Sequence, residues 1–543
     1  MAGDNLSLKA DCTFMATYDL VIRGADLIDG TGMPARRADL AVAGDRIAEI
    51  GRIAPSMGHR VIEATGLTLT PGFVDIHSHS DYHLLLQPTA DSAVRQGVTL
   101  EIGGNCGYAA APIWGPWLEE RAALYRNLYG LDHTWQGVAD YCRRLETVGI
   151  SENFGLLIGH NTLRGSAMGG VNRAPSADEL GAMIDGARQG MAEGALGIST
   201  GLLYAPACFS RPDELTAIAA AVKDAGGILT SHMRSEGDGL LEAIDEIIGV
   251  AEQARISLQI SHLKTSGERN WSKLPEAIRR IEEAQARGLD VSCDRYPYTA
   301  SNTGLQAVLP DWALEGGQQA RVDRLCDPGA RARMTQDLTA RYPADYWSRL
   351  MISEVTRDEH RRYEGLRVSD AAKLVDTEPV DFVLALLLAE RMQVDAIFFT
   401  MCEDNLNAIL QKPYAMIGSD SGCRSHEGPL SHGRPHPRTF GTFPRVLGRF
   451  VRESRLLDLP TAIRKMTWDP CRKLGVSDRG HLQRGCVADL VLFDSATVSD
   501  RATYEVPIQY PIGIHYVFVN GIAVIEAGEH TGARPGRVVR RVS

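Results

Sequence analysis

Eight short apolar runs, each followed by a stretch with helical periodicity, constrain the fold of this chain more than any other feature. The runs cover residues 72–79, 98–106, 153–161, 194–202, 226–234, 256–264, 289–298 and 414–422. The segments between them are amphipathic, and Ser176 is the predicted N-cap of one helix. Eight alternations of strand and helix are typical of a closed parallel barrel. The alternative, an open doubly wound sheet, would carry a glycine-rich phosphate turn after the first strand, where this chain has HSHSD.

Both ends of the chain have a different, β-rich sequence pattern. Near the N-terminus the runs 18–30, 38–51 and 61–72 each close on Gly or Asp-Gly, which predicts a small antiparallel sheet. The same pattern recurs at residues 486–494 and 515–530, where Asn520-Gly521 is a strong hairpin signal. One small β-sandwich domain built from both ends explains this pattern economically.

The predicted fold is therefore α/β: a (β/α)₈ TIM-like barrel, the small β domain, and an insertion between strands 7 and 8. We expect a flexible leader over 1–16, the first part of the β domain over 17–71, the barrel over 72–473, and the second part with the tail over 474–543. The insertion, residues 300–413, contains predicted helices near Ser369–Val375 and from Thr377-Glu378-Pro379. Its position predicts a lid over the barrel mouth, and the alternative is an insertion with a purely structural role.

Composition excludes several partner classes. The 543 residues carry a formal net charge of −11, which argues against nucleic acid as a partner. The best apolar stretch, Val383 to Ala389, is far shorter than the roughly 18 residues of a membrane span. Charged residues before any apolar run exclude a secretory signal, and ten cysteines without CxxC spacing indicate a reduced, cytoplasmic protein.

Metal-binding residue types stand at the ends of the predicted strands. His77 and His79 are two residues apart, so their side chains share one face of the first strand. In a barrel, strand ends converge at the catalytic face. Six side chains would meet a metal there: His77, His79, Cys106, His232, His262 and Asp420. Each histidine alone could be an ordinary core or surface residue, and Cys106 a small buried apolar group.

Several motifs together resemble a known family from about residue 18 to about 535. They are TPGFVDIHSHSD, GGNCG, SHMRSE, SHLK, YPYTA, IGSD, RPHPRTFGTFPRVLGRF and DRGHLQRGCVADLVLFD. The chain resembles the amidohydrolase superfamily and, more narrowly, its D-aminoacylase / N-acyl-D-amino-acid deacylase family. The fourth strand, GALGISTGL, has no lysine to be carboxylated as a metal bridge, which weighs against the dihydroorotase and hydantoinase branch.

The resemblance implies one tight Zn²⁺ on Cys106, His232 and His262, and a second, weaker metal position on His77, His79 and Asp420. Asp420 would also be the catalytic acid–base group, or only a ligand in the simpler interpretation.

For the substrate carboxylate, Arg438 is the best candidate because guanidinium binds carboxylate bidentately. Lys264 and Tyr296 are further candidate contacts; Arg438 could instead cap a loop, and Tyr296 could pack in the barrel. His160 is either a pocket residue or a packing one. Arg295 and the long CRSHEGPLSHG stretch leave the preferred substrate side chain open.

The predicted function is zinc-dependent hydrolysis of the amide bond of N-acyl-D-amino acids, which are small-molecule substrates. The D preference rests on the resemblance alone. The alternative is a cyclic amidase or a dipeptidase of the same superfamily. A non-enzymatic scaffold fits less well, since such relatives typically lose metal ligands and this chain keeps all of them.

Overall fold

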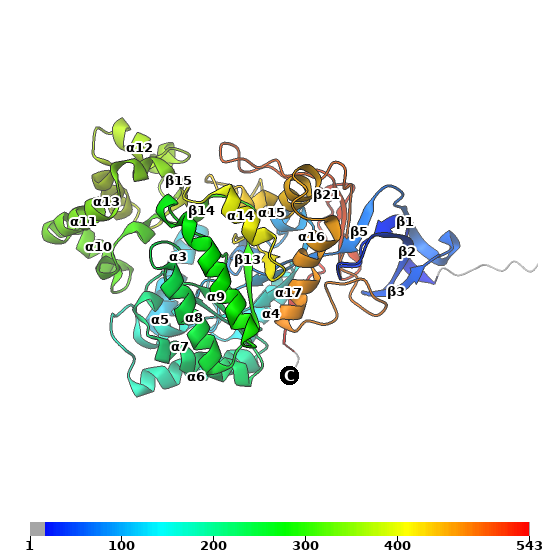
Figure 1. The fold of residues 1–543 in the computed structure, drawn as a ribbon, viewed down its shortest axis with the longest axis horizontal. Coiled ribbons are helices and arrows are strands. Elements are labelled where there is room, and N and C mark those ends of the chain that lie inside the picture. Colours follow the sequence, from blue (N-terminus) through cyan, green and yellow to red (C-terminus); the bar gives the residue numbers. More distant parts are fainter. Residues whose placement is uncertain (1–16, 542–543) are drawn as a thin grey trace, which may run out of the picture.

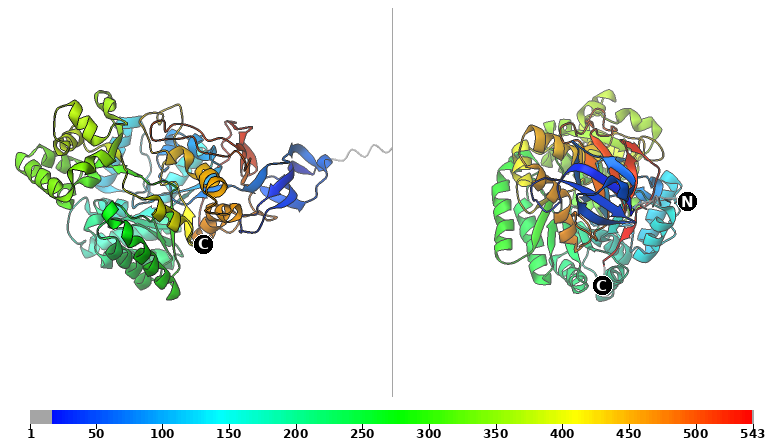
Figure 2. Two further views of the ribbon diagram at one scale, coloured as in Figure 1. Left: turned by 45° about the horizontal axis from the view of Figure 1, so that its top comes forward. Right: turned by 90° about the vertical axis from the view of Figure 1, so that its right-hand side faces the viewer.

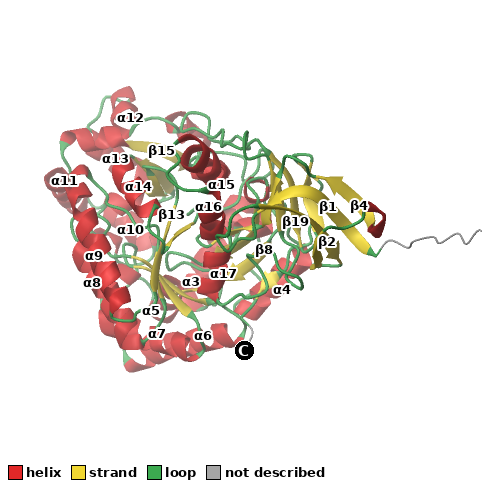
Figure 3. Cartoon of the chain, turned by 45° about the vertical axis from the view of Figure 1, so that its right-hand side comes forward, coloured by secondary structure: helices red, strands yellow, loops and turns green. Residues whose placement is uncertain are grey.

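The computed structural model describes residues 17–541, so the leader expected over residues 1–16 lies outside the described part. The fold is mixed α/β (Figure 1), as the sequence predicts. Helices gather at one side and the strands of the chain ends at the other (Figure 3). In the described residues, no helix combines the length and apolarity needed to cross a membrane.

All eight apolar runs contain a strand, and neighbouring strands pair in parallel. The strands are β6 (Phe73–Asp75), β7 (Val98–Gly103), β8 (Asn153–Leu156) continued by β9 (Ile158–Gly159), β10 (Gly197–Gly201), β11 (Ile228–His232), β12 (Leu258–Ile260), β13 (Val291–Arg295) and β17 (Ala415–Ile417). They form two sheets, in the orders β17-β13-β12-β11-β10-β9 and β22-β8-β7-β6. A parallel bridge between Ser78 and Ser421 links the segments that follow β6 and β17. The C-terminal strand β22 (Val538–Val539) pairs with β8.

Amphipathic helices follow these strands and bury one face against them. The helices are α4 (Val138–Val148), α6 (Ala177–Ala192), α7 (Pro212–Asp224), α8 (Leu240–Ala254), α9 (Leu274–Ala286), α14 (Glu403–Leu410), α16 (Leu459–Met466) and α17 (Trp468–Leu474). Ser176 caps α6 as predicted: it accepts from the backbone of Glu179, whose side chain accepts from the Ser176 backbone in return. Along α8, Ile244, Ile247 and Ile248 recur at helical spacing and are buried in one core cluster.

The strands of the two chain ends join in one nine-stranded sheet. They are β1 (Tyr18–Leu27), β2 (Arg36–Ala43), β3 (Arg46–Gly51), β4 (Gly58–Glu63), β5 (Thr68–Pro71), β18 (Leu490–Phe493), β19 (Ile514–Val519), β20 (Ile522–Glu526) and β21 (Glu529–His530). Strand β5 joins the halves by pairing with β18, and the end-on view in Figure 2 places both halves together.

The predicted antiparallel pairing is confirmed for most of this sheet, but it is wrong for two pairings of β1. Strand β1 pairs in parallel with β4 and with β5, because the chain crosses over between them instead of turning back in a hairpin. The Asn520-Gly521 hairpin is confirmed between β19 and β20. Both turn residues have positive φ, 50° and 80°, as a tight hairpin turn requires.

The insertion between β13 and β17 has its own sheet and its own apolar core. Its strands β14 (Ser301–Gly304), β15 (Leu350–Val355) and β16 (Val394–Phe398) are antiparallel. Its helices are α10 (Gln318–Cys326), α11 (Pro328–Arg341), α12 (Val368–Leu374) and α13 (Pro379–Ala389), the last two where the sequence predicts helices. Buried Trp347, Val383 and Leu387 belong to its core cluster.

A buried polar network fixes the chain-end sheet to the parallel strands. Asp489, just before β18, forms an ion pair with Arg479 and accepts from the backbone of Asn520 at 2.7 Å. The side chain of Asn153, at the start of β8, donates to Asp489 at 3.1 Å. A carboxylate that serves three partners out of contact with water is costly to remove, because each partner is then left unsatisfied.

We therefore predict that Asp489→Ala lowers the free energy of unfolding by about 3–5 kcal/mol, because it leaves the Arg479 charge buried without its partner. Thermal melting followed by circular dichroism measures this as a lower Tm. The control is Glu63→Gln, which breaks the exposed Arg23–Glu63 pair of 2.6 Å and should change stability by less than about 1 kcal/mol. Equal shifts in both variants would contradict the role of the network.

Candidate metal centre and active site

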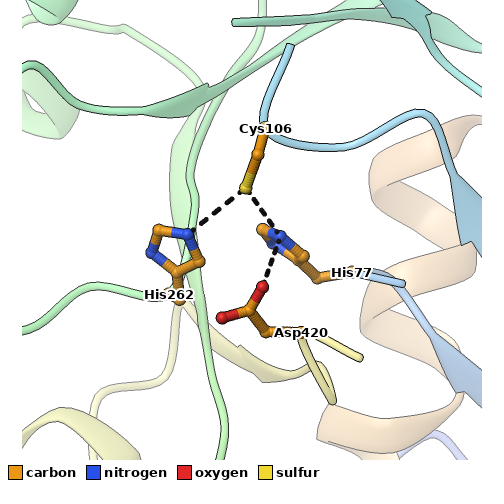
Figure 4. A group of neighbouring side chains, drawn as sticks. All are labelled: His77, Cys106, His262 and Asp420. Atoms are coloured by element: carbon orange, nitrogen blue, oxygen red, sulfur yellow. Dashed lines mark hydrogen bonds and ion pairs between the residues drawn. The ribbon is translucent and has the colours of Figure 1, made fainter. Parts of the chain in front are cut away.

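Four side chains that could hold a metal ion come from four strand ends and meet in one buried cluster (Figure 4): His77, Cys106, His262 and Asp420. Cys106 Sγ lies 3.3 Å from His77 Nε2 and 3.4 Å from His262 Nε2. His77 Nε2 lies 3.5 Å from Asp420 Oδ1. The donor atoms all fall within 4.8 Å of one another. Sequence reasoning therefore identified all four residues of this cluster.

His232, at the end of β11, is a further predicted metal ligand. Its ring lies 4.4 Å from that of His262, and it forms a second group of donors with His262 and Glu236. Both nitrogens of His232 are buried and have no hydrogen-bond partner among the described residues. Buried polar atoms are almost always satisfied, so unpartnered imidazole nitrogens beside a thiol and other imidazoles fit a metal ligand. Thiolate and imidazole donors are typical of zinc.

The sulfur of Cys106 is held in a form that suits metal binding. Burial opposes ionisation of the thiol, but the imidazoles of His77 and His262 hold its pKa well below the usual value. A thiolate is the species that ligates metals. Cys106 therefore does not behave as a merely apolar buried cysteine, the alternative left open by the sequence.

Asp420 lies between the histidines and an arginine. His79 Nε2 is 3.0 Å from Asp420 Oδ1, and Arg438 Nη1 is 2.8 Å from Oδ2. The Arg438 contact is an ion pair without hydrogen-bond alignment. Burial raises the pKa of this carboxyl group, but the cations around it, led by Arg438, hold the pKa well below its usual value. The group is thus ionised at neutral pH.

The backbone at this cluster is strained in a way that aims the side chains inward. Cys106, His262 and Asp420 have positive φ angles of 52°, 35° and 53°. Such conformations cost about 1–3 kcal/mol each in residues other than glycine, and they concentrate at functional sites. In the GGNCG turn, a Cβ on Gly104 would lie 2.0 Å from the carbonyl oxygen of Leu157, so only glycine fits there.

Two positioning carboxylates were missed by sequence reasoning. Asp294, on β13, accepts from the His262 backbone at 2.8 Å and lies 3.1 Å from His77 Nδ1. Glu236 lies 2.9 Å from His262 Nδ1. Carboxylates behind a ligating histidine fix its ring orientation and tautomer. The signal for Glu236 was present in SHMRSE, four residues after His232, whereas Asp294 had no distinguishing pattern.

The cluster opens into a cavity of about 1130 Å³ lined by strand-end loops and the insertion. Lys264 and Arg438 line it. Lys264 forms an ion pair with Glu236. Burial raises the pKa of the Glu236 carboxyl group, but Lys264 and the nearby imidazoles hold that pKa below its usual value. Tyr296 is fully buried behind the cavity wall, with the guanidinium of Arg438 4.6 Å from its ring centre.

Two other residues named from the sequence, His160 and Arg295, lie away from the candidate metal ligands. His160 starts helix α5 (His160–Met168), and its Nε2 lies 2.9 Å from Glu214 in a buried network, so of its two interpretations the packing one fits. Arg295 is buried with its guanidinium 4.2 Å from the Tyr296 ring centre. In the long stretch after Asp420, Arg424 pairs with Glu354 of the insertion.

A model of the amidohydrolase family matches residues 60–525. The chain belongs to the amidohydrolase family. It is 36% identical to a D-aminoacylase of Alcaligenes xylosoxydans xylosoxydans, over 97% of this chain and 98% of that protein. It is also 36% identical to the N-acyl-D-glutamate deacylase of the same organism, over 96% of both.

The fold is also similar to that of a solved amidohydrolase. The crystal structure of N-acyl-D-glutamate deacylase from Bordetella bronchiseptica, complexed with zinc and a phosphonate inhibitor, matches with a TM-score of 0.82 and 33% identity. The match covers 97% of this chain and all of that one. The family resemblance recognised in the sequence motifs is thereby confirmed.

For this amidohydrolase we predict that Cys106→Ala binds sharply less zinc than the wild type, because the thiolate is the strongest zinc donor in the cluster. Metal content per chain, measured by mass spectrometry after gel filtration, checks this. Cys471→Ala is the matched control, since Cys471 is also buried but lies in an apolar core cluster. Equal zinc content in the two variants would show that Cys106 is not a ligand.

Proposed function

We propose that this amidohydrolase uses zinc to hydrolyse the amide bond of N-acyl-D-amino acids, releasing a carboxylate and a free D-amino acid. The observation that carries the proposal is the buried group of Cys106, His77, His262 and Asp420 in a cavity that also presents Arg438. Relatives that cover almost the whole chain are D-amino-acid deacylases. Assays of N-acetyl-D-methionine beside a hydantoin and a dipeptide separate this function from its alternatives.

The proposed ligand roles are those that the family resemblance implies. Cys106, His232 and His262 would hold the principal zinc, and His77, His79 and Asp420 a second, weaker metal. When bound, zinc supplies a Lewis acid for the scissile carbonyl and lowers the pKa of a water molecule to about 7. Asp294 and Glu236 keep the ring nitrogens of His77 and His262 directed at the cluster.

Asp420 is the proposed proton carrier. Because it is ionised, it can accept a proton from the attacking water at neutral pH and then pass that proton to the leaving nitrogen. Its contact with Arg438 holds the carboxylate in one orientation. One oxygen faces the histidines and the other faces Arg438, so the same group lies between the ligands and the substrate-binding side.

Asp420→Asn keeps the size of the side chain and removes its basicity, so kcat should fall by at least about 10²-fold. Steady-state kinetics with N-acetyl-D-methionine measures the loss. Zinc at the principal site should be largely retained, because Cys106, His232 and His262 are untouched. Near-normal turnover with zinc bound would refute the role of Asp420.

Substrate recognition is proposed to rest on Arg438 and Lys264, with Tyr296 behind Arg438. In the free enzyme each cation is paired with an acid, Arg438 with Asp420 and Lys264 with Glu236. A substrate carboxylate would share these cations. If Arg438 binds the substrate carboxylate and the scissile carbonyl lies at the metal ligands, only one enantiomer of the substrate can place its side chain in the pocket.

Wild-type enzyme should therefore favour N-acetyl-D- over N-acetyl-L-methionine, and Arg438→Ala should lose much of both activity and preference. Losing a charge-assisted contact costs about 1.5–3 kcal/mol, which is about tenfold or more in kcat/KM. Arg445→Ala is the control, since Arg445 lies on the same helix, α15 (Arg438–Arg445), and pairs with Asp500 away from the cavity. Equal hydrolysis of both enantiomers by the wild type would refute the stereochemical assignment.

The architecture is proposed to follow the predicted domain plan. The parallel strands would form a closed (β/α)₈ barrel over residues 72–473, which the Ser78–Ser421 bridge and the backbone bond from Asp420 to His77 support. Residues 17–71 and 474–543 would form the small β domain, as a sandwich. The insertion, residues 300–413, would act as the lid, since Asn302 and Glu354 line the cavity.

A further inference from the structure

Two of the arginines that line the cavity, Arg121 and Arg321, have no acidic partner among the described residues. Arg121 lies on helix α3 (Gly115–Tyr129) and Arg321 on helix α10 of the insertion. Neither forms an ion pair with any residue of the described range 17–541. Arg321 donates through Nε to the carbonyl of Gly316 at 3.1 Å, while its Nη2 is buried with no partner in that range. Burial lowers the pKa of Arg321, as expected for a cation removed from water.

The acidic residues nearby form no ion pair with either arginine. Glu120 and Asp311 line the same part of the cavity. Glu120 Oε2 accepts from the backbone nitrogen of Gln318 at 3.4 Å and lies outside ion-pair distance of either arginine. A guanidinium left partly buried and unpaired is unfavourable unless a ligand completes its hydrogen bonds.

Aromatic rings lie beside the Arg121 guanidinium on the cavity wall. The guanidinium of Arg121 lies 5.3 Å from the ring centre of Tyr108 and 5.4 Å from that of Trp117. The Tyr108 ring lies 6.0 Å from that of Tyr204, which in turn lies 4.8 Å from that of His232. A continuous wall therefore runs from the proposed metal ligands to the arginines.

At Tyr204, this wall lies across the parallel strands from Arg438. Tyr108 and Tyr204 follow β7 and β10, whereas Asp420, which contacts Arg438, follows β17. In the six-stranded sheet, β17 is one edge strand and β10 is separated from it by β13, β12 and β11. A substrate with its α-carboxylate at Arg438 and its amide at the metal ligands directs its acyl group toward Tyr204 and the two arginines.

We propose that Arg121 and Arg321 form an anion subsite for a carboxylate at the far end of the acyl group, so that N-succinyl- or N-glutaryl-D-amino acids are preferred substrates. The inference rests on the proposed function and names its substrate class. Bidentate guanidinium groups recognise carboxylates in this way. An acetyl group leaves the subsite empty, whereas a dicarboxylic acyl group spans the wall formed by Tyr204 and Tyr108.

The test compares acyl groups of equal size that differ in charge. We expect zinc-loaded enzyme to show a kcat/KM at least about tenfold higher for N-succinyl- than for N-succinamoyl-D-methionine, the loss typical of one charge-assisted contact. In Arg321→Gln and Arg121→Gln this ratio should fall toward one. Arg126→Gln is the matched control, because Arg126 lies with Arg121 on helix α3, is exposed and pairs with Asp132 at 3.1 Å. Zinc content verifies that each variant is folded.

The proposal would be overturned if the wild type showed equal kcat/KM for the charged and the uncharged acyl group, for succinyl and glutaryl groups alike. A ratio that persists in both glutamine variants would also overturn it. If the variants instead change the preference for N-acetyl-D-glutamate over N-acetyl-D-glutamine, the anion belongs to the amino-acid side chain and the acyl assignment is wrong.

Failure of the proposed function is a separate outcome. If the wild type hydrolyses neither the acetyl nor the succinyl substrate, that function fails, and calorimetric titration of the zinc-loaded protein with succinate still tests the subsite. Weaker succinate binding by Arg321→Gln than by Arg126→Gln supports the subsite. No succinate binding by the wild type overturns it.

Discussion

The arrangement of the whole molecule depends on bringing imidazole, thiolate and carboxylate donors together out of contact with water. His77, Cys106, His262 and Asp420 lie on four separate strand ends, and their donor atoms fall within 4.8 Å of one another. Such a cluster is unfavourable by itself, because each polar atom has lost water. A bound cation removes that cost, so metal binding and the stability of this part of the fold are coupled.

The backbone is organised to maintain the cluster. Three of its residues adopt left-handed conformations, and the surrounding structure must hold them there. The backbone nitrogen of Asp420 donates to the carbonyl of His77 at 2.8 Å, and that of His262 donates to Asp294 at 2.8 Å. These bonds tie the first strand to the eighth and the sixth to the seventh, so the strand order itself sets the positions of the donors.

Much of this could be predicted because it follows from periodicity and from position along strands. The eight strands, the Ser176 cap, the insertion and the metal-binding residue types all carry local signals. The parallel pairing of β1 and the positioning role of Asp294 could not be predicted, since they depend on contacts between distant segments. Arg121 and Arg321 gave no sequence signal either, because the subsite exists only where α3 meets the insertion.

The central claim is that one thiolate and two imidazoles hold the catalytic zinc, and X-ray absorption at the zinc edge tests it most directly. Protein loaded with one zinc per chain should show one sulfur scatterer at about 2.3 Å together with nitrogen or oxygen scatterers near about 2.0–2.1 Å. The sulfur contribution should disappear in Cys106→Ala and persist in Cys471→Ala. A zinc environment of nitrogen and oxygen alone in the wild type would contradict the account.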